Sequence, residues 1–206
     1  MPMRSRCQTS PSHAADAAVV MDVARRGFTL VELLIALTLM SILAAVAIPN
    51  MSIGRHQAEA AMQTLGSDLL AAQRMAITRQ HDIIVEFDVD QRTVHVVEDA
   101  NNDGSRDADE HVSSHPLGDG VAFGHGGAPA DPIGSGPITF TQRTDGNPSV
   151  TFHRDGSASE AGGVYVQSAR DEAAGRPDGA RLLVVDRATG RPSWFRYSGG
   201  AWQRGF

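Results

Sequence analysis

The densest group of metal-binding side chains in the sequence is a twelve-residue acidic stretch. Oxygen-bearing side chains stand at positions 1, 3, 5, 7, 9 and 12, and a glycine stands at position 6. The residues at these six positions are Asp99, Asn101, Asp103, Ser105, Asp107 and Glu110. This spacing is typical of calcium loops, in which hard oxygens surround the ion, the glycine makes the sharp turn and the carbonyl at position 7 is a ligand. Strand-like residues precede the stretch, so a second interpretation stands beside calcium: an acidic hairpin loop whose Asp, Asn and Gly simply make turns.

The residue types exclude several other kinds of chemistry. All 18 basic residues are arginine, so the chain cannot form a lysine Schiff base with pyridoxal phosphate or complete a phosphate-binding loop. Cys7 is the single cysteine, which rules out an intrachain disulfide. Serine, histidine and aspartate are plentiful, but no nucleophile-elbow motif joins them. The sequence therefore indicates a protein that is not an enzyme and that requires no cofactor, with calcium as the one ion that a pattern favours.

An apolar run near the start is long enough to cross a membrane as a helix. It covers residues 28–48, and 17 of its 21 residues are apolar. At 1.5 Å per residue this helix is about 32 Å long, close to the roughly 30 Å of a bilayer core. Arg25 and Arg26 precede the run, which favours a cytoplasmic N-terminus and an exported C-terminal part. A signal peptide or a plain anchor gives no role to Glu32, whose carboxylate is costly in a membrane and needs a partner.

The eight residues that end at Glu32 resemble the processing signature of type IV prepilins and type II secretion pseudopilins. They read Arg-Arg-Gly-Phe-Thr-Leu-Val-Glu and begin at Arg25. The resemblance implies that a membrane peptidase cuts after Gly27 and methylates the new amino terminus at Phe28. It also implies that Glu32 meets the amino terminus of a neighbouring subunit during assembly, and that Pro49 bends the helix.

In this interpretation residues 1–27 are a leader that takes no part in the fold. A start at Met21 would give a shorter leader that is more typical of the family, so we expect the true start there. Removing residues 1–27 leaves 179 residues with 14 arginines and 22 acidic residues, a net charge of −8 and no cysteine.

Behind the apolar run, the periodicity predicts a helix followed by short strands. Apolar residues recur at three- and four-residue steps, so we expect one helix over residues 28–80 whose second half is amphipathic, although Gly54 and Gly66 lower its helix propensity. A glycine-rich segment, Gly118 to Gly136, predicts a surface loop with a flexible tip. Runs with a strand-like pattern cover residues 83–87, 94–96, 138–140, 150–152, 164–166, 181–186 and 194–197. We expect an α+β fold, with the helix packed on antiparallel sheets that residues 81–206 form.

Three short segments add a finer resemblance, to the GspH/FimT family of minor pilin-like proteins. They are Leu69–Ile77, Val150–Gly156 and Thr189–Arg191. The resemblance implies a pilin-like fold, in which a long N-terminal helix is transmembrane over residues 28–48 and its second half packs on sheets of short strands.

The same resemblance implies a function, that of a minor pseudopilin most like the H component of type II secretion. Such a chain is a structural subunit near the filament tip. Its precursor spans the inner membrane once, with the N-terminus in the cytoplasm and residues 81–206 in the periplasm, and it then enters the pseudopilus. The implied partners are the prepilin peptidase and methylase, the other pseudopilins of the filament and its tip, and inner membrane lipid before assembly.

The uneven charge of the chain keeps a DNA-binding alternative open. Residues 81–135 hold 12 acidic residues and two arginines, whereas residues 143–206 hold nine arginines and seven acidic residues. FimT-like members bind DNA through arginines near a Gly-Arg-x-Arg motif. Here Arg191 matches its first arginine, the second is absent, and Arg187, Arg196 and Arg204 stand nearby. The net charge of −8 opposes approach to a polyanion.

Overall fold

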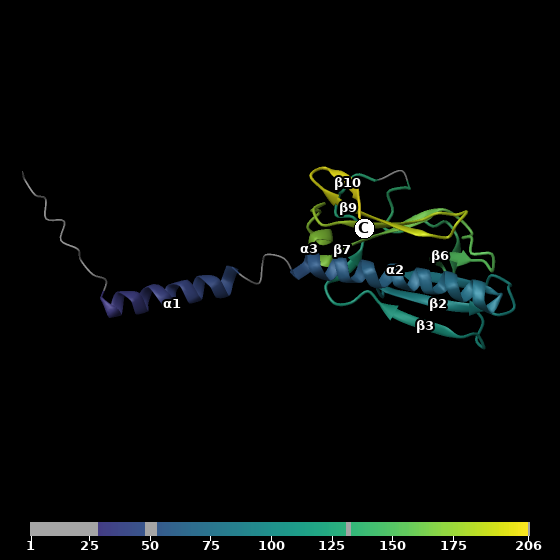
Figure 1. Cartoon of the computed structure of the whole chain (residues 1–206), viewed down its shortest axis with the longest axis horizontal. Coiled ribbons are helices and arrows are strands. Elements are labelled where there is room, and N and C mark those ends of the chain that lie inside the picture. Colours follow the sequence, from purple (N-terminus) through teal and green to yellow (C-terminus); the bar gives the residue numbers. More distant parts are fainter. Residues whose placement is uncertain (1–28, 48–52, 131–132, 206) are drawn as a thin grey trace, which may run out of the picture. The chain divides into compact units, whose positions relative to one another are not determined.

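The computed structural model describes residues 29–47, 53–130 and 133–205 of the 206-residue chain (Figure 1). These residues belong to two compact units. The first ends at Val46 and contains all but the last residue of the helix α1 (Leu30–Ala47), and the second contains α2 (Ile53–Arg79) and all the strands. The prediction of one continuous helix over residues 28–80 depends on residues 48–52, which lie outside the described residues, so it stays a prediction.

The helix α1 has a capped start. The Thr29 hydroxyl accepts a hydrogen bond from the Glu32 N–H (3.2 Å), and the Thr29 carbonyl accepts the first helical bond, from the Leu33 N–H (3.1 Å). Thr29 is therefore the N-cap, and Glu32 lies in the first turn, where the positive end of the helix dipole favours a carboxylate. The hydroxyls of Thr38 and Ser41 donate to carbonyls of the preceding turn, at 2.9 and 2.8 Å.

Apolar side chains surround α1 on all sides and remain exposed. Leu30, Leu37 and Leu43 are 81%, 57% and 69% exposed. A helix that is apolar all round is stable only in apolar surroundings, because it has no polar face to present to water. The expected membrane span over residues 28–48 is not confirmed: within the described residues, no helix combines the length and hydropathy of a membrane-crossing segment.

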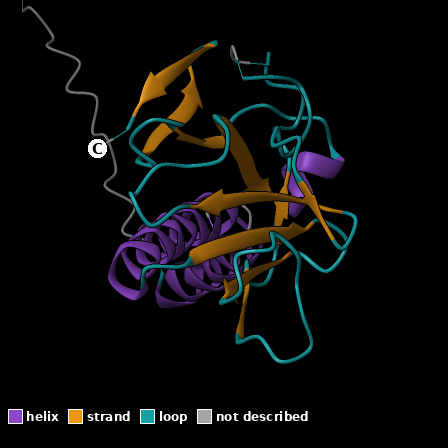
Figure 2. Ribbon diagram, turned by 90° about the vertical axis from the view of Figure 1, so that its right-hand side faces the viewer, coloured by secondary structure: helices purple, strands orange, loops and turns teal. Residues whose placement is uncertain are grey.

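Within the described residues, the second unit packs α2 against two sheets of five strands each (Figure 2). The first sheet has the order β3-β2-β1-β6-β5, and the second has the order β10-β9-β8-β7-β4. The strands are β1 (Asp82–Asp88), β2 (Thr93–Asp99), β3 (Val112–Pro116), β4 (Val121–Phe123), β5 (Arg143–Thr144), β6 (Asn147–Phe152), β7 (Gly162–Ser168), β8 (Arg181–Val185), β9 (Pro192–Ser198) and β10 (Ala201–Arg204). A short helix, α3 (Ala169–Ala173), follows β7. Neighbouring strands pair antiparallel, so the predicted α+β fold is confirmed.

The core lies between α2 and both sheets. The buried side chains of α2 form one stripe: Ala58, Ala61, Met62, Leu65, Leu69, Ala72 and Ala76. Below it, Phe87 of β1 stacks on Phe140 at 5.6 Å between ring centroids and meets Phe123 of β4 edge-on at 6.3 Å. Full burial of each large apolar side chain contributes about 1.5–3 kcal/mol. The amphipathic second half of the predicted helix is thereby confirmed.

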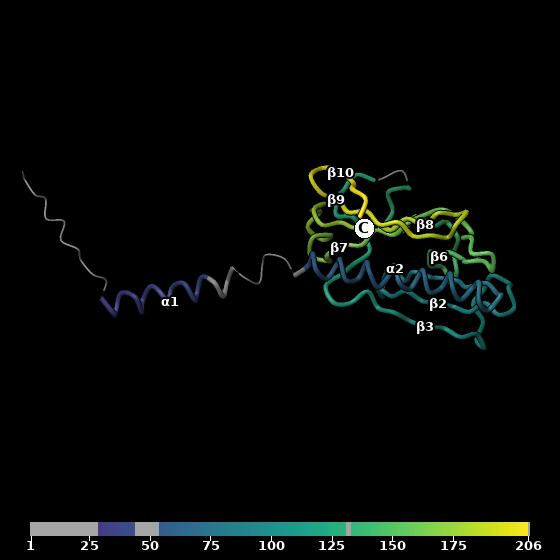
Figure 3. Tube along the Cα trace, in the orientation of Figure 1, coloured from purple at the N-terminus to yellow at the C-terminus, as the bar shows by residue number. Residues whose placement is uncertain are grey.

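Gly66 lets α2 approach the second sheet closely. A β-carbon at this position would lie 2.7 Å from the indole nitrogen of Trp194 in β9. Glycine inside a helix costs about 1 kcal/mol relative to alanine. The cost is offset here because the indole packs directly on the helix backbone, on the flank of α2 where β7 to β10 lie side by side (Figure 3).

Two expectations, one about a loop and one about a strand, are wrong in part. The segment Gly118–Gly136 contains β4, which pairs with β7, and both Val121 and Phe123 are buried. This segment is anchored in the core because Val-Ala-Phe is a short alternating strand among its glycines. The predicted strand 138–140 makes only an isolated bridge, from Ile138 to β7. The six other predicted strands are confirmed as β1, β2, β6, β7, β8 and β9, whereas the sequence pattern does not predict β3, β4, β5, β10 or α3.

Candidate functional site

The residues predicted for processing and assembly lie at the start of the chain. Gly27, Phe28 and Pro49 fall outside the described residues. Glu32 is exposed in the first turn of α1, and its carboxylate has no hydrogen bond or ion pair with any described residue. Thr38 and Ser41 donate their hydroxyl hydrogens to carbonyls of the same helix, so Glu32 is the one polar side chain of α1 with no hydrogen bond to any described residue.

One glutamine of α2 joins the three segments that carry the finer resemblance. The side-chain amide of Gln73 donates to the carbonyls of Gly156 and Thr189, at 2.6 Å each. Gly156 lies in the turn after β6 of the first sheet, and Thr189 lies in the turn between β8 and β9 of the second. Gly190 has φ +63°, and a β-carbon there would collide with both the Gly156 carbonyl and the Gln73 amide. This motif junction, made of Gln73, Gly156, Thr189 and Gly190, ties α2 to both sheets.

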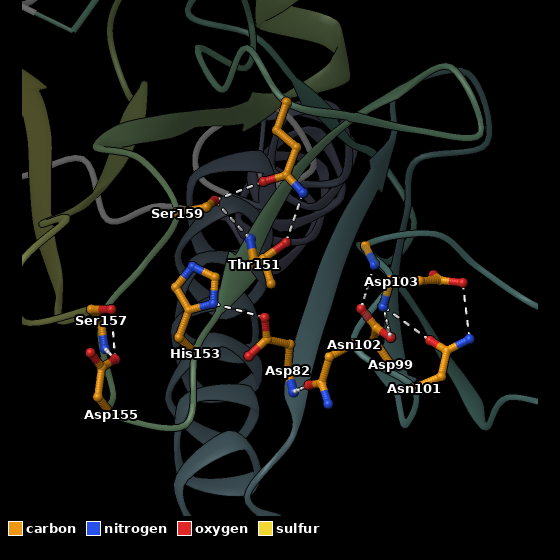
Figure 4. Close-up of polar contacts among 12 residues, drawn as sticks. Asp82, Asp99, Asn101, Asn102, Asp103, Thr151, His153, Asp155, Ser157 and Ser159 are labelled. Atoms are coloured by element: carbon orange, nitrogen blue, oxygen red, sulfur yellow. Dashed lines mark hydrogen bonds and ion pairs between the residues drawn. The ribbon is translucent and has the colours of Figure 1, made fainter.

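Two aspartates hold the turns of the motif junction. The Asp155 carboxylate accepts hydrogen bonds from the hydroxyl and the N–H of Ser157, at 2.6 and 2.9 Å (Figure 4). The Asp186 carboxylate accepts the corresponding bonds from Thr189, at 2.7 and 2.9 Å. In each case the hydroxyl bond, followed by the N–H bond, lowers the carboxyl pKa below its ordinary value of 3.8. The ionised form of each aspartate therefore stabilises its turn.

The acidic stretch folds into a loop whose carboxylates accept hydrogen bonds from the loop itself (Figure 4). Asp99 is buried and accepts from the N–H groups of Asp103 (3.1 Å) and Gly104 (2.8 Å). Glu110 accepts from the N–H groups of Ala100 (3.1 Å) and Asp107 (3.0 Å). The two ends of the predicted calcium spacing are thus both bonded to backbone amides.

The middle of the acidic loop is bonded in the same way. The Asn101 amide donates to carboxylate oxygens of Asp103 (2.9 Å) and Asp107 (3.0 Å), and the Ser105 N–H donates to Asp103 (2.8 Å). Within the described residues, no three histidine, cysteine, aspartate or glutamate side chains converge as metal ligands. Turn formation explains all of these contacts, and calcium binding by the loop stays a prediction.

A buried glutamate that sequence reasoning missed fastens the acidic loop to the first sheet. Glu86 of β1 is 1% exposed. One of its oxygens accepts from the Asn147 amide (2.6 Å), and the other lies 3.5 Å from the guanidinium of Arg106, which comes from the acidic loop. In the strand pattern Glu86 occupies an outward position, where a solvent-exposed side chain is expected. Glu86 is buried instead because the acidic loop covers it, and no local sequence pattern predicts this burial.

The predicted nucleic-acid residues are exposed, but the structure does not bring all three together. Arg187 lines a hollow that His153 shares. Arg191 and Arg196 line two other hollows, which have Trp194 and Arg204 in common. Arg204 of β10 therefore stands near both predicted arginines, because β10 pairs with β9.

Comparisons with known proteins agree with both resemblances. The model of the prokaryotic N-terminal methylation motif matches residues 23–48, and the model of the type II transport protein GspH matches residues 61–190. No curated protein sequence matches the chain.

Solved structures give more distant likenesses. A crystal structure of the minor pseudopilin EpsH from the type II secretion system of Vibrio cholerae has 15% identity, covers 70% of this chain and 99% of its own, and has a TM-score of 0.46. Another structure of EpsH from the type 2 secretion system of Vibrio cholerae has 15% identity, covers 72% and 94%, and has a TM-score of 0.40. Because the GspH model matches more than half of the sequence, the chain belongs to the GspH family of type II transport proteins.

Proposed function

We propose that this chain is a minor pseudopilin, a structural subunit of a type II secretion pseudopilus without catalytic activity of its own. The observation that carries the proposal is the order of two matches: a methylation motif over residues 23–48 followed by a GspH region over residues 61–190. The division of the molecule supports it as well. An assembly subunit needs one element that contacts its neighbours and one folded domain that it carries, and α1 and the second unit are separate compact units.

The proposal gives the precursor one span in the inner membrane. Prepilin peptidase cuts after Gly27 and methylates Phe28, and residues 81–206 lie in the periplasm. The exposed apolar side chains of α1 support this step, because their burial in lipid or among other apolar helices lowers the free energy. During assembly α1 exchanges lipid for the helices of neighbouring subunits, and Glu32 pairs with the amino group of a neighbour's Phe28.

The test is co-assembly of a Glu32→Ala variant with the other pseudopilins of its own system. We expect cleavage and membrane insertion to continue, while recovery of the variant with the assembled pseudopilus falls at least about tenfold, because breaking a buried ion pair costs about 3–5 kcal/mol. Thr38→Ala is the matched control, since that hydroxyl bonds within its own helix. Normal co-assembly of Glu32→Ala would contradict the role of Glu32, and a chain that never joins the pseudopilus would contradict the proposed function.

A DNA-binding minor pilin is the second candidate. The observation that favours it is the group of exposed arginines, Arg191, Arg196 and Arg204, around Trp194. A gel shift of duplex DNA at low salt that disappears on Arg191→Ala would support this function. Absence of a shift at low salt would exclude DNA binding, because contacts with phosphates are strongest at low salt.

A further inference from the structure

A groove of about 510 Å³ runs along one side of α2, between the helix and the second sheet. Its helical wall extends from Glu59 to Leu70, and eleven steps of 1.5 Å give this wall a length of about 16 Å. The opposite wall comes from β9 and from Arg204 of β10. We call it the arginine groove. It is long enough for three turns of a helix or for a short extended segment.

The floor of the arginine groove is apolar. Met62 and Leu70 come from α2, and Trp194 and Phe195 come from β9. Met62 is 2% exposed and belongs to the core, so the floor is continuous with the core. Trp194 is held against Gly66 of α2 and is therefore a preformed aromatic surface. Aromatic residues, methionine and arginine are the types enriched in protein–protein interfaces.

The charges of the arginine groove are not balanced within the described residues. Arg181 donates to the Glu59 carboxylate (2.7 Å) and to the Gly179 carbonyl (2.8 Å), so its charge is paired. Arg196 and Arg204 have no ion pair with any described residue. Two unpaired cations thus stand at the rim of an apolar floor, in a chain whose formal net charge is −6. The matching ligand carries carboxylates on either side of an apolar side chain.

We propose that the arginine groove binds an acidic segment of a neighbouring pseudopilin, with an apolar side chain against Trp194 and carboxylates on Arg196 and Arg204. The inference rests on the proposed function, which supplies neighbouring subunits. A protein segment fits this groove better than DNA does for two reasons. Phosphates gain nothing from an apolar floor, and the acidic remainder of the chain repels a long polyanion more strongly than it repels a short segment.

Site-specific photocross-linking in cells that contain the complete secretion system tests the proposal. A benzophenone amino acid replaces Gln63, an exposed residue at the helical edge of the groove, in the full chain. We expect an adduct with another pseudopilin, whose linked peptide, identified by mass spectrometry, contains aspartate or glutamate. The double variant Arg196→Glu/Arg204→Glu should lower the adduct yield at least about tenfold, since each lost charge pair is replaced by repulsion.

The matched control is Arg154→Glu/Arg187→Glu, which changes the net charge equally at exposed turn residues outside the groove. It should leave the adduct unchanged. Replacing the partner's linked carboxylate by arginine should restore the adduct of the groove variant. Processing and co-purification with the pseudopilus are measured in the same cells, so a chain that fails to join the filament overturns the proposed function.

Two outcomes overturn the inference alone. In the first, the chain joins the filament but the linked peptide is not acidic, or the adduct survives charge reversal in the groove. In the second, no pseudopilin adduct forms from the assembled chain. A gel shift of the purified full chain with duplex DNA, lost in Arg196→Glu/Arg204→Glu, would then assign the groove to DNA instead.

Discussion

The two long helices of this chain differ in where their apolar side chains lie and in what these side chains contact. In α1, apolar side chains point in every direction and stay exposed, and its single carboxylate, Glu32, has no partner among the described residues. In α2, apolar side chains form one stripe that is buried against two sheets, and Gln73 bonds to a turn of each sheet. The second unit therefore supplies the stabilising contacts of α2, whereas the apolar side chains of α1 have no such cover among the described residues of its own unit, and the proposed function gives them lipid or neighbouring helices as partners.

Because of this difference, substitutions in the two regions should affect two different properties of the protein, its stability and its assembly. A substitution in α2 or in the sheets should change the unfolding free energy of the second unit. A substitution in α1 should leave that quantity unchanged and alter association with lipid or with neighbouring subunits.

The largest effect is expected from truncating the buried stripe of α2. Leu69→Ala should lower the unfolding free energy of the second unit by about 2–5 kcal/mol, because it removes a fully buried side chain and leaves a cavity. Denaturant unfolding of the full chain in detergent, followed by tryptophan fluorescence, measures it, since Trp194 and Trp202 both lie in this unit. Leu37→Ala in α1 is the matched control, and a similar loss there would erase the contrast between the helices.

The sign of the stability change in Gly66→Ala distinguishes the effect of helix propensity from the effect of the contact with Trp194. Helix propensity alone predicts that Gly66→Ala stabilises α2 by about 1 kcal/mol. The contact with Trp194 predicts destabilisation by about 1–3 kcal/mol, because the new methyl group would push the indole away. The same fluorescence-detected unfolding measures the effect, and a more stable variant would show that the helix and β9 are not in close contact.

Removing Gln73 should disconnect α2 from the two turns of the motif junction. Gln73→Ala deletes two hydrogen bonds, each with a net contribution of about 0.5–1.5 kcal/mol, so we expect a loss of about 1–3 kcal/mol. Gln91→Ala, at an exposed turn residue, serves as the control and should have no effect. Equal stability of the Gln73 and Gln91 variants would mean that packing alone joins the helix to the sheets.

Sequence patterns predicted the elements that depend on periodicity. The stripe of α2 and the strands β1, β2, β6, β7, β8 and β9 follow from steps of three to four and of two residues, because each element buries one face. The family resemblance located the segments of the motif junction, although not that Gln73 joins them. What the patterns missed depends on contacts between distant segments. Glu86 is buried only because Arg106 and Asn147 cover it, and Gly66 is required only because Trp194 lies above it.

The acidic loop gives a small predicted effect, and it depends on calcium. Because backbone amides already bond to Asp99 and Glu110, the loop should keep its fold when a chelator removes calcium. Binding, if the spacing acts as a calcium site, should raise the unfolding free energy by about 0.4 kcal/mol when calcium equals its dissociation constant. Calorimetric titration of the full chain, with Asp103→Asn as control, measures calcium binding and its dissociation constant, and denaturant unfolding with and without calcium measures the stability change. The absence of heat in the millimolar range would end the calcium prediction.

Acid should weaken the turns of the motif junction. The pKa values of Asp155 and Asp186 are lowered in the folded chain below 3.8, so their ionised forms stabilise the fold. This contribution is complete well above pH 3.8, and it is lost as the pH falls through the lowered folded-state pKa values. NMR titration of the two carboxyls checks the direction. Midpoints at or above 3.8 would contradict the hydrogen bonds from Ser157 and Thr189.

The amino terminus of the chain recovered from the membrane tests the central claim most directly. If α1 is the assembly element of a processed pseudopilin, mass spectrometry of the chain co-expressed with prepilin peptidase should find a first residue Phe28 with a methylated amino group. It should find the uncut leader when Gly27 is replaced by a larger residue. A chain that keeps residues before Phe28, or that is cut elsewhere in the presence of an active peptidase, would contradict the claim.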